Sequence, residues 1–208
     1  MELELFDISG KKASKKVKLD DAVFGIEPNT QAIYLDVKQY LANKRQGTSK
    51  AKERAEVKGS TRKIKKQKGT GTARAGDIKN PLFVGGGTIF GPRPRNYSFK
   101  LNKKLKRLAR KSALSQRAKE NNIIVLKDFS FDAPKTKDYL QLLDKLKVSG
   151  IKTLLVLPDS DSNVMLSSRN IKNAKVVRAQ DLNTYDIMNY KKLLIAESSV
   201  EKIVNTLN

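Results

Sequence analysis

Ile123-Ile124-Val125-Leu126 is an uninterrupted run of large aliphatic residues. A run of this kind is typical of a β-strand that is buried on both faces. Three further strands are predicted along the same half of the chain, at Thr153–Leu157, 175–177 and 193–196. Because strands without polar alternation occur in parallel sheets covered on both faces, these segments predict a mainly parallel sheet.

Amphipathic helices are predicted between and after these strands. Apolar residues at helical spacing identify them, together with a Ser-x-x-Glu capping box before the last one. The first predicted helix carries Tyr139, Leu142, Leu143 and Leu146. Two shorter ones cover 164–169 and 185–188, and the last begins with Ser198-Ser199-Val200-Glu201. Strands and helices that alternate in this order indicate an α/β fold, with a three-layer α/β/α domain.

The N-terminal segment belongs to the same domain. It predicts a strand at Glu2–Phe6, a turn at 9–11 and a second short strand that includes Val17 and Leu19. Thr30 is the predicted N-cap of a helix. We expect the face of this helix formed by Ile33, Val37, Tyr40 and Leu41 to pack in the core. A later helix is predicted with one face formed by Leu101, Leu105, Leu108, Ser112 and Ala113.

The positive charge is concentrated in one part of the chain. The formal net charge is +22. Residues 44–100 contain 16 Lys and Arg against three acids, and residues 101–119 contain eight against none, so these two stretches carry 21 of the 22 charges. Such asymmetry indicates a surface for a polyanion. Nucleic acid is the first expectation, and an anionic membrane a distant second, because residues 44–100 carry too many glycines for an amphipathic basic helix.

Residues 44–100 show neither helical nor strand periodicity. They hold nine of the twelve glycines and few apolar residues. A segment of this length without regular structure is either functional or ordered by a partner. We therefore predict a globular domain formed by residues 1–43 and 101–208, with 44–100 inserted as a long, extended, basic loop that is mobile until RNA binds.

Catalytic and metal-binding motifs are missing from the sequence. There is no Cys and no His, which excludes disulfides, Ser-His and Cys-His catalytic pairs and zinc sites built from those residues. Residues 69–74 and 71–78 resemble dinucleotide and phosphate loops but lack the required third Gly and the Lys-Ser/Thr pair. We expect Asp159 and Asp161, which follow a predicted strand, to form a turn and a helix N-cap. No catalytic residue, metal or cofactor is predicted.

The composition of the basic loop favours RNA. Gly, Gln, Thr and Ser lie among its charges, as do Phe83, Phe90, Tyr97 and Phe99. Lys and Arg neutralise phosphates, Gly permits close backbone approach, polar side chains bond 2′-hydroxyls, and aromatic rings stack on bases. The predicted RNA-binding residues are Arg45, Gln46, Thr48, Lys50, Lys52, Arg54, Lys58, Arg62, Lys63, Lys65, Lys66, Gln67, Lys68, Arg74, Lys79, Arg93, Arg95, Lys103, Lys104, Lys106, Arg107 and Arg110.

Several sequence blocks in fixed order resemble one family, the universal large-subunit ribosomal protein four of bacterial type. The blocks are Arg45-Gln46-Gly47-Thr48, 54–59, Gln67-Lys68-Gly69-Thr70-Gly71, Ala73-Arg74-Ala75-Gly76, Pro81, Gly85-Gly86-Gly87, Phe90-Gly91-Pro92-Arg93-Pro94, Asn102-Lys103-Lys104 and 133–137. The chain departs from the family at Ile64-Lys65, where a Pro-aromatic pair is common, and at Thr72, where Arg is common.

This resemblance implies a specific role. It implies a structural protein of the large ribosomal subunit, with an α/β domain on the subunit surface and a loop that enters 23S-type ribosomal RNA. The loop tip, formed by Gln67, Lys68, Gly69, Thr70, Gly71 and Thr72, would contribute to the wall of the peptide exit tunnel near ribosomal protein twenty-two. Some bacterial members also repress their own operon through its messenger leader.

The expected location is the cytoplasm, in the ribosome. The N-terminal residues 1–6 do not form a signal peptide, and no run of 18 or more apolar residues predicts a membrane span. No small-molecule substrate is expected. Two other functions remain open from the residues alone: an enzyme that uses the α/β sheet, and a free regulatory binder of RNA or DNA.

Overall fold

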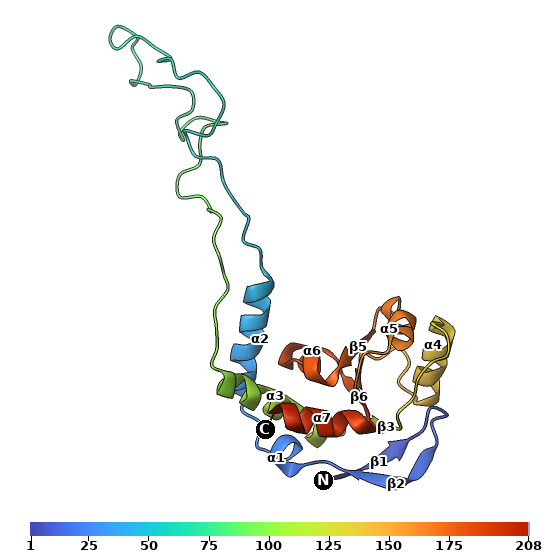
Figure 1. The fold of residues 1–208 in the computed structure, drawn as a ribbon. Coiled ribbons are helices and arrows are strands. Elements are labelled where there is room, and N and C mark those ends of the chain that lie inside the picture. Colours follow the sequence, from blue (N-terminus) through green and yellow to red (C-terminus); the bar gives the residue numbers. More distant parts are fainter. Residues whose placement is uncertain (208) are drawn as a thin grey trace. The chain divides into compact units, whose positions relative to one another are not determined.

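The computed structural model describes residues 1–207, which form two compact units. Unit 1 consists of Met1–Leu41 and the chain from Lys100 onward, and unit 2 is Ala42–Phe99. Unit 1 contains a single sheet with strand order β2-β1-β3-β6-β4-β5 (Figure 1). Its strands are β1 (Glu2–Phe6), β2 (Lys12–Lys18), β3 (Ile123–Leu126), β4 (Thr153–Leu157), β5 (Ala174–Arg178) and β6 (Lys192–Ala196).

The pairing of these strands is mainly parallel. Only β1 and β2 pair antiparallel, with Leu3 opposite Val17, whereas β1–β3, β3–β6, β6–β4 and β4–β5 are parallel pairs. The prediction of a mainly parallel sheet is therefore confirmed. The antiparallel hairpin turns at Gly10, whose positive φ of 76° suits a residue without a side chain.

Helices cover both faces of the sheet, as the three-layer prediction requires. They are α1 (Asp21–Phe24), α2 (Thr30–Lys44), α3 (Lys103–Lys119), α4 (Thr136–Lys145), α5 (Ser162–Arg169), the 3₁₀ helix η1 (Ala179–Asp181), α6 (Thr184–Asn189) and α7 (Glu197–Leu207). Helices α4 and α5 line one face, while α1, α3, α6 and α7 line the other. No helix within residues 1–207 is long and apolar enough to cross a membrane.

Two hydrophobic clusters lie on the two faces, and alternate residues of the central strands supply both. Leu193 and Ile195 of β6 enter one cluster, and Leu194 and Ala196 enter the other. Strand β4 divides in the same way, and its five residues are all buried. This alternation explains why the last four residues of each strand, 154–157 and 193–196, are all apolar, because neither face meets water.

Two helix caps differ from their prediction. Helix α2 begins at Thr30, but Asn29 is its cap, since its Oδ1 accepts the Ala32 amide at 3.0 Å. Helix α7 begins at Glu197, directly after β6, so Ser198 lies inside the helix and the predicted capping box is wrong. Instead Asp128, which follows β3, accepts bonds from the Ser198 amide at 3.2 Å and hydroxyl at 2.9 Å.

A third cap prediction is confirmed. Asp161 caps α5 by accepting the Asn163 and Val164 amides. Asp159 also has a structural partner, because its Oδ2 accepts from Lys202 Nζ at 2.6 Å. Neither carboxylate therefore needs a catalytic explanation.

The predicted faces of α2 and α3 are buried only in part. Leu41, which was expected in the core, is 49% exposed, and Leu108 on the predicted face of α3 is 38% exposed. Ser112 and Ala113 of the predicted face are buried, and so are Ala109 and Ser115, which were not predicted. Ser112 Oγ accepts the Asn29 amide, and Ser115 donates to the carbonyl of Val23. Small and hydroxyl side chains allow this close packing, and the longer Leu108 lies outside it.

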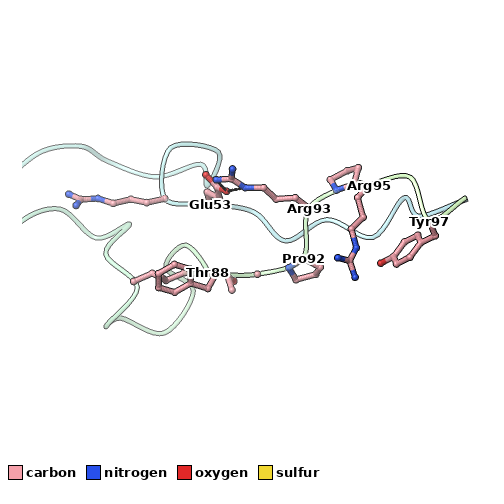
Figure 2. A pocket seen from close by; sticks show the side chains of 11 residues that line it. Glu53, Thr88, Pro92, Arg93, Arg95 and Tyr97 are labelled. Atoms are coloured by element: carbon pink, nitrogen blue, oxygen red, sulfur yellow. Dashed lines mark hydrogen bonds and ion pairs between the residues drawn. The ribbon is translucent and has the colours of Figure 1, made fainter. Parts of the chain in front are cut away.

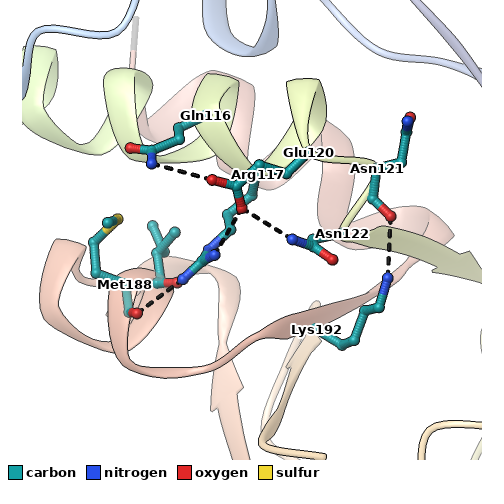
Figure 3. Close-up of polar contacts among 8 residues, drawn as sticks. Gln116, Arg117, Glu120, Asn121, Asn122, Met188 and Lys192 are labelled. Atoms are coloured by element: carbon teal, nitrogen blue, oxygen red, sulfur yellow. Dashed lines mark hydrogen bonds and ion pairs between the residues drawn. The ribbon is translucent and has the colours of Figure 1, made fainter.

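Arg117 has a structural role at the end of α3 (Figure 3). Its guanidinium donates to the carbonyls of Ile187 and Met188 at 3.1 and 2.8 Å, at the C-terminal end of α6. It also pairs with Glu120 at 2.9 Å. These bonds satisfy carbonyl groups that the end of a helix leaves free. One of the charges counted toward the basic surface therefore holds the fold of unit 1.

Candidate RNA interface

Unit 2 consists of two chain branches that lie side by side, shown in blue-green and green in Figure 1. We call residues 42–66 the outgoing branch, 67–74 the tip and 75–99 the returning branch. Backbone hydrogen bonds join the branches without forming a regular strand pair: Arg95 N–H to Gly47 O, Ala51 N–H to Pro92 O, Thr88 N–H to Lys52 O and Ile64 N–H to Gly76 O, at 2.9–3.1 Å. Because so few backbone hydrogen bonds join the branches, residues 44–100 contain no regular strand. This explains why their sequence shows no strand periodicity.

Glycines allow the branches to approach each other. A Cβ on Gly47 would lie 2.1 Å from the carbonyl oxygen of Arg95, and one on Gly87 would lie 2.3 Å from the Arg54 nitrogen. Gly86 approaches the Asn80 carbonyl in the same way, and Gly85 bends the chain with a φ of 84°. The glycine cluster 85–87 thus makes a tight bend, and its close backbone contacts are with the protein itself.

All three acids of the loop form ion pairs between residues of unit 2. Glu53 pairs with Arg93 across the branches, with Arg93 Nε 2.6 Å from Glu53 Oε1 (Figure 2). Asp77 pairs with Arg54 at 2.9 Å, and Glu56 pairs with Lys50. The hydrogen bond from Lys50 lowers the pKa of the Glu56 carboxyl below its usual range. These ion pairs therefore brace the loop, and they hold the guanidinium groups of Arg54 and Arg93 in place.

Tyr97 is a second point of bracing. The guanidinium of Arg45 lies 3.9 Å from the centre of its ring, and that of Arg95 lies 4.6 Å from it. Hydrogen bonding to Arg95 lowers the pKa of the Tyr97 hydroxyl. Cation–π contacts of this kind hold aromatic and guanidinium planes together. Two predicted RNA-binding arginines therefore also organise the base of the loop.

The cations at and near the tip are exposed. Lys65 Nζ of the outgoing branch donates to Thr72 Oγ1 at 2.9 Å, and Lys63 bonds Gln67. Lys66, Lys68 and Arg74 are exposed and form no ion pair with a carboxylate in the part of the chain that the structure describes. These side chains have the exposure and charge that phosphate contacts need.

The predicted RNA-binding residues divide between the two units. Those from Arg45 to Arg95 all lie on unit 2, and five lie on α3 of unit 1. On α3, Lys103, Lys104 and Arg107 are exposed, whereas Lys106 and Arg110 are half-buried. The Nε atom of Arg110 is buried without a hydrogen-bond partner among the described residues. The ion pairs of Glu53, Glu56 and Asp77 with loop cations were not predicted from the sequence. The presence of only three acids in so basic a segment was a signal that could have indicated them.

The sequence of this chain has counterparts among known proteins. A family model described as the ribosomal protein L4/L1 family matches residues 17–206. The chain belongs to this family. Large ribosomal subunit protein uL4 of Flavobacterium johnsoniae is 63% identical over 208 residues, which is the whole of both chains. The uL4 proteins of Christiangramia forsetii and Cytophaga hutchinsonii are each 62% identical over the same length.

Membership of the L4/L1 family confirms the resemblance seen in the sequence blocks. It also confirms the prediction that the chain is not an enzyme, since the family consists of ribosomal proteins. The match extends through unit 2, so the loop belongs to the family pattern as much as the α/β domain does.

Proposed function

We propose that this member of the L4/L1 family is a structural constituent of the large ribosomal subunit in the cytoplasm, and that it binds 23S-type ribosomal RNA mainly through unit 2. The observation that carries the proposal is the pairing of all three loop acids with residues of unit 2. With the acids engaged, the surplus of Lys and Arg is left for an external polyanion. Folded RNA supplies phosphates along the whole length of such a loop.

The tip has its own proposed role. We assign Gln67, Lys68, Gly69, Thr70, Gly71 and Thr72 to the wall of the peptide exit tunnel, next to ribosomal protein twenty-two, as the family resemblance implies. Gly69 and Gly71 have positive φ values of 79° and 63°, and no heavy atom outside the adjacent residues lies within 4 Å of where their Cβ atoms would be. A tight bend with small residues and open surroundings suits a narrow passage between RNA and protein.

Repression of the chain's own operon belongs to the same proposal. The phosphates of a messenger leader and of ribosomal RNA are chemically equivalent, so exposed Lys103, Lys104 and Arg107 on α3 suit either ligand. A reporter fused to the operon leader would be translated less when the protein is supplied in excess. Unchanged reporter output would remove repression from the proposal and leave the ribosomal role intact.

The salt dependence of binding tests the role of the loop. The variant carrying Lys65→Glu with Lys66→Glu should bind deproteinised large-subunit RNA more weakly. Since log K changes by about 0.7–0.9 per phosphate contact for each tenfold change in salt, its slope should flatten by roughly 1.5. The matched control is Lys16→Glu with Lys18→Glu, which changes the charge equally on exposed β2. A wild-type slope near zero, or equal losses in both variants, would contradict the proposal.

Co-purification separates a built-in subunit from a free regulatory RNA binder. The chain should sediment with the large subunit in a sucrose gradient after a high-salt wash, as mass spectrometry can determine. Quantitative release into the soluble fraction would favour the free binder instead.

A further inference from the structure

Three residues of the returning branch are extruded between two bonds that cross the loop. Thr88 N–H donates to Lys52 O at 2.9 Å, and Ala51 N–H donates to Pro92 O at 3.0 Å. Residues 51 and 52 are neighbours on the outgoing branch, whereas residues 89–91 separate the corresponding positions on the returning branch. The extra residues therefore form a bulge, and bulges redirect side chains.

Phe90 lies at the apex of this bulge and contacts almost nothing in the protein. Its relative exposure is 103%, and its φ is 53°, in a region that bulky residues rarely adopt. Gly91 beside it fits tightly, because a Cβ there would lie 2.5 Å from Ala51 Cβ. The chain thus holds a large apolar ring in water at a conformational cost, and no contact within the protein offsets that cost.

The surroundings of Phe90 are cationic. It lines a cavity of about 800 Å³ together with Ile89, Arg54, Arg93 and Arg95. The one acid lining this cavity, Glu53, is paired with Arg93, and Asp77 holds Arg54. Figure 2 shows Arg93 reaching across to Glu53 on the other branch. An open aromatic face beside oriented guanidinium groups matches the chemistry of a nucleotide, with a flat base and an anionic phosphate.

The other loop aromatics do not offer the same surface. Two guanidinium groups lie over the ring of Tyr97, and Phe83 and Phe99 are far less exposed than Phe90. Stacking by an unpaired base needs a free ring face, and among these four rings Phe90 exposes the most.

We infer that Phe90 is the stacking surface for one unpaired base of ribosomal RNA, and that Arg54 and Arg93 hold phosphates of the same RNA segment. The inference rests on the proposed RNA-binding function and adds a specific contact to it. Stacking is tolerant of base identity because every base has a π-face, so the site selects an unpaired nucleotide rather than a particular sequence.

Substitutions at Phe90 test this assignment in the full chain, with deproteinised large-subunit RNA as the probe. Phe90→Ala should lower affinity by about 5- to 150-fold, the range measured for loss of one stacked base, without changing the salt slope. Phe90→Tyr should retain affinity, while Phe90→Leu, which is apolar but not aromatic, should lose it. Val84→Ala, at a position that is 106% exposed on the same branch, is the matched control and should bind normally.

The outcomes separate this inference from the proposed function. If the wild type binds with a steep salt slope but Phe90→Ala binds equally well, the stacking site is refuted and RNA binding stands. Retained affinity in Phe90→Leu refutes stacking in favour of an apolar contact. Wild-type binding without salt dependence refutes the proposed function itself. Circular dichroism of each variant should match the wild type, because Phe90 packs against nothing.

Discussion

At the scale of single residues, glycine decides how closely the loop branches approach. Gly87 lies against the backbone of Arg54, and Arg54 is held in turn by Asp77. The contact is with backbone atoms, which cannot move aside as the end of a flexible side chain can. The position of an arginine that we assign to phosphate binding therefore depends on a neighbouring residue that has no side chain.

Gly87→Ala should displace Arg54 and weaken binding to large-subunit RNA. The added Cβ would lie 2.3 Å from Arg54 N and 2.4 Å from Arg54 Cα, and overpacking of this kind costs about 1–3 kcal/mol. Filter binding at fixed salt measures the loss of affinity. Gly59→Ala is the control, because its Cβ would meet Ile78 at 3.4 Å, an ordinary contact. Equal affinity of the two variants would show that Gly87 has no part in placing Arg54.

At the scale of the element, helix α7 depends on a residue distant in sequence. Asp128→Ala should lower the free energy of unfolding of unit 1 by about 0.5–2 kcal/mol, because the carboxylate caps the first turn of α7. Urea unfolding followed by circular dichroism measures the change. Asp132→Ala removes an exposed acid from the same connection and should be nearly neutral. A loss as large in Asp132→Ala would mean that charge, and not capping, is responsible.

The helix ends mark the limit of what local sequence can determine. Strands β1, β3 and β4 have the predicted bounds, because the alternation of β1 and the apolar runs of β3 and β4 each end at a polar residue or a proline. Asp128 could not be identified as a cap, since it approaches α7 only when β3 and β6 pair. The burial of Ala109 in place of Leu108 is likewise set by how closely α3 packs, which the helical period alone does not contain.

The candidate RNA interface was predictable in composition but not in arrangement. The excess of Lys and Arg in residues 44–119 indicates a polyanion as the ligand from the sequence alone. The pairing of Glu53 with Arg93 joins residues 40 positions apart, and the bulge at Phe90 arises from bonds between the branches. Such contacts depend on how the chain returns along itself, and no local pattern records that path.

At the scale of the whole molecule, the two units do not share a core. Neither hydrophobic cluster of the described chain includes a residue from Ala42–Phe99. Deleting residues 62–74 should therefore leave unit 1 folded, with an unchanged unfolding midpoint. The bonds at Gly47, Ala51 and Lys52 lie outside the deletion, so the base of the loop should still bind the subunit.

The same deletion should change the exit tunnel if the tip is part of its wall. Particles containing the shortened chain should assemble, as mass spectrometry of gradient fractions can establish, and should respond differently to drugs that bind the tunnel. Replacing 62–74 by an equally long Gly-Ser segment controls for loop length. Failure of assembly, without any tunnel effect in the surviving particles, would make the tip a docking element instead.

The order of strands in the sheet also sets an order of events during synthesis. Strand β6 pairs with β3 on one side and β4 on the other, yet it is the last strand of the chain. Until residue 196 has left the ribosome that makes it, the strands on either side of β6 have no bridge between them. Unit 2 is finished much earlier, at Phe99. The newborn chain therefore presents its most basic segment while its globular unit is still incomplete.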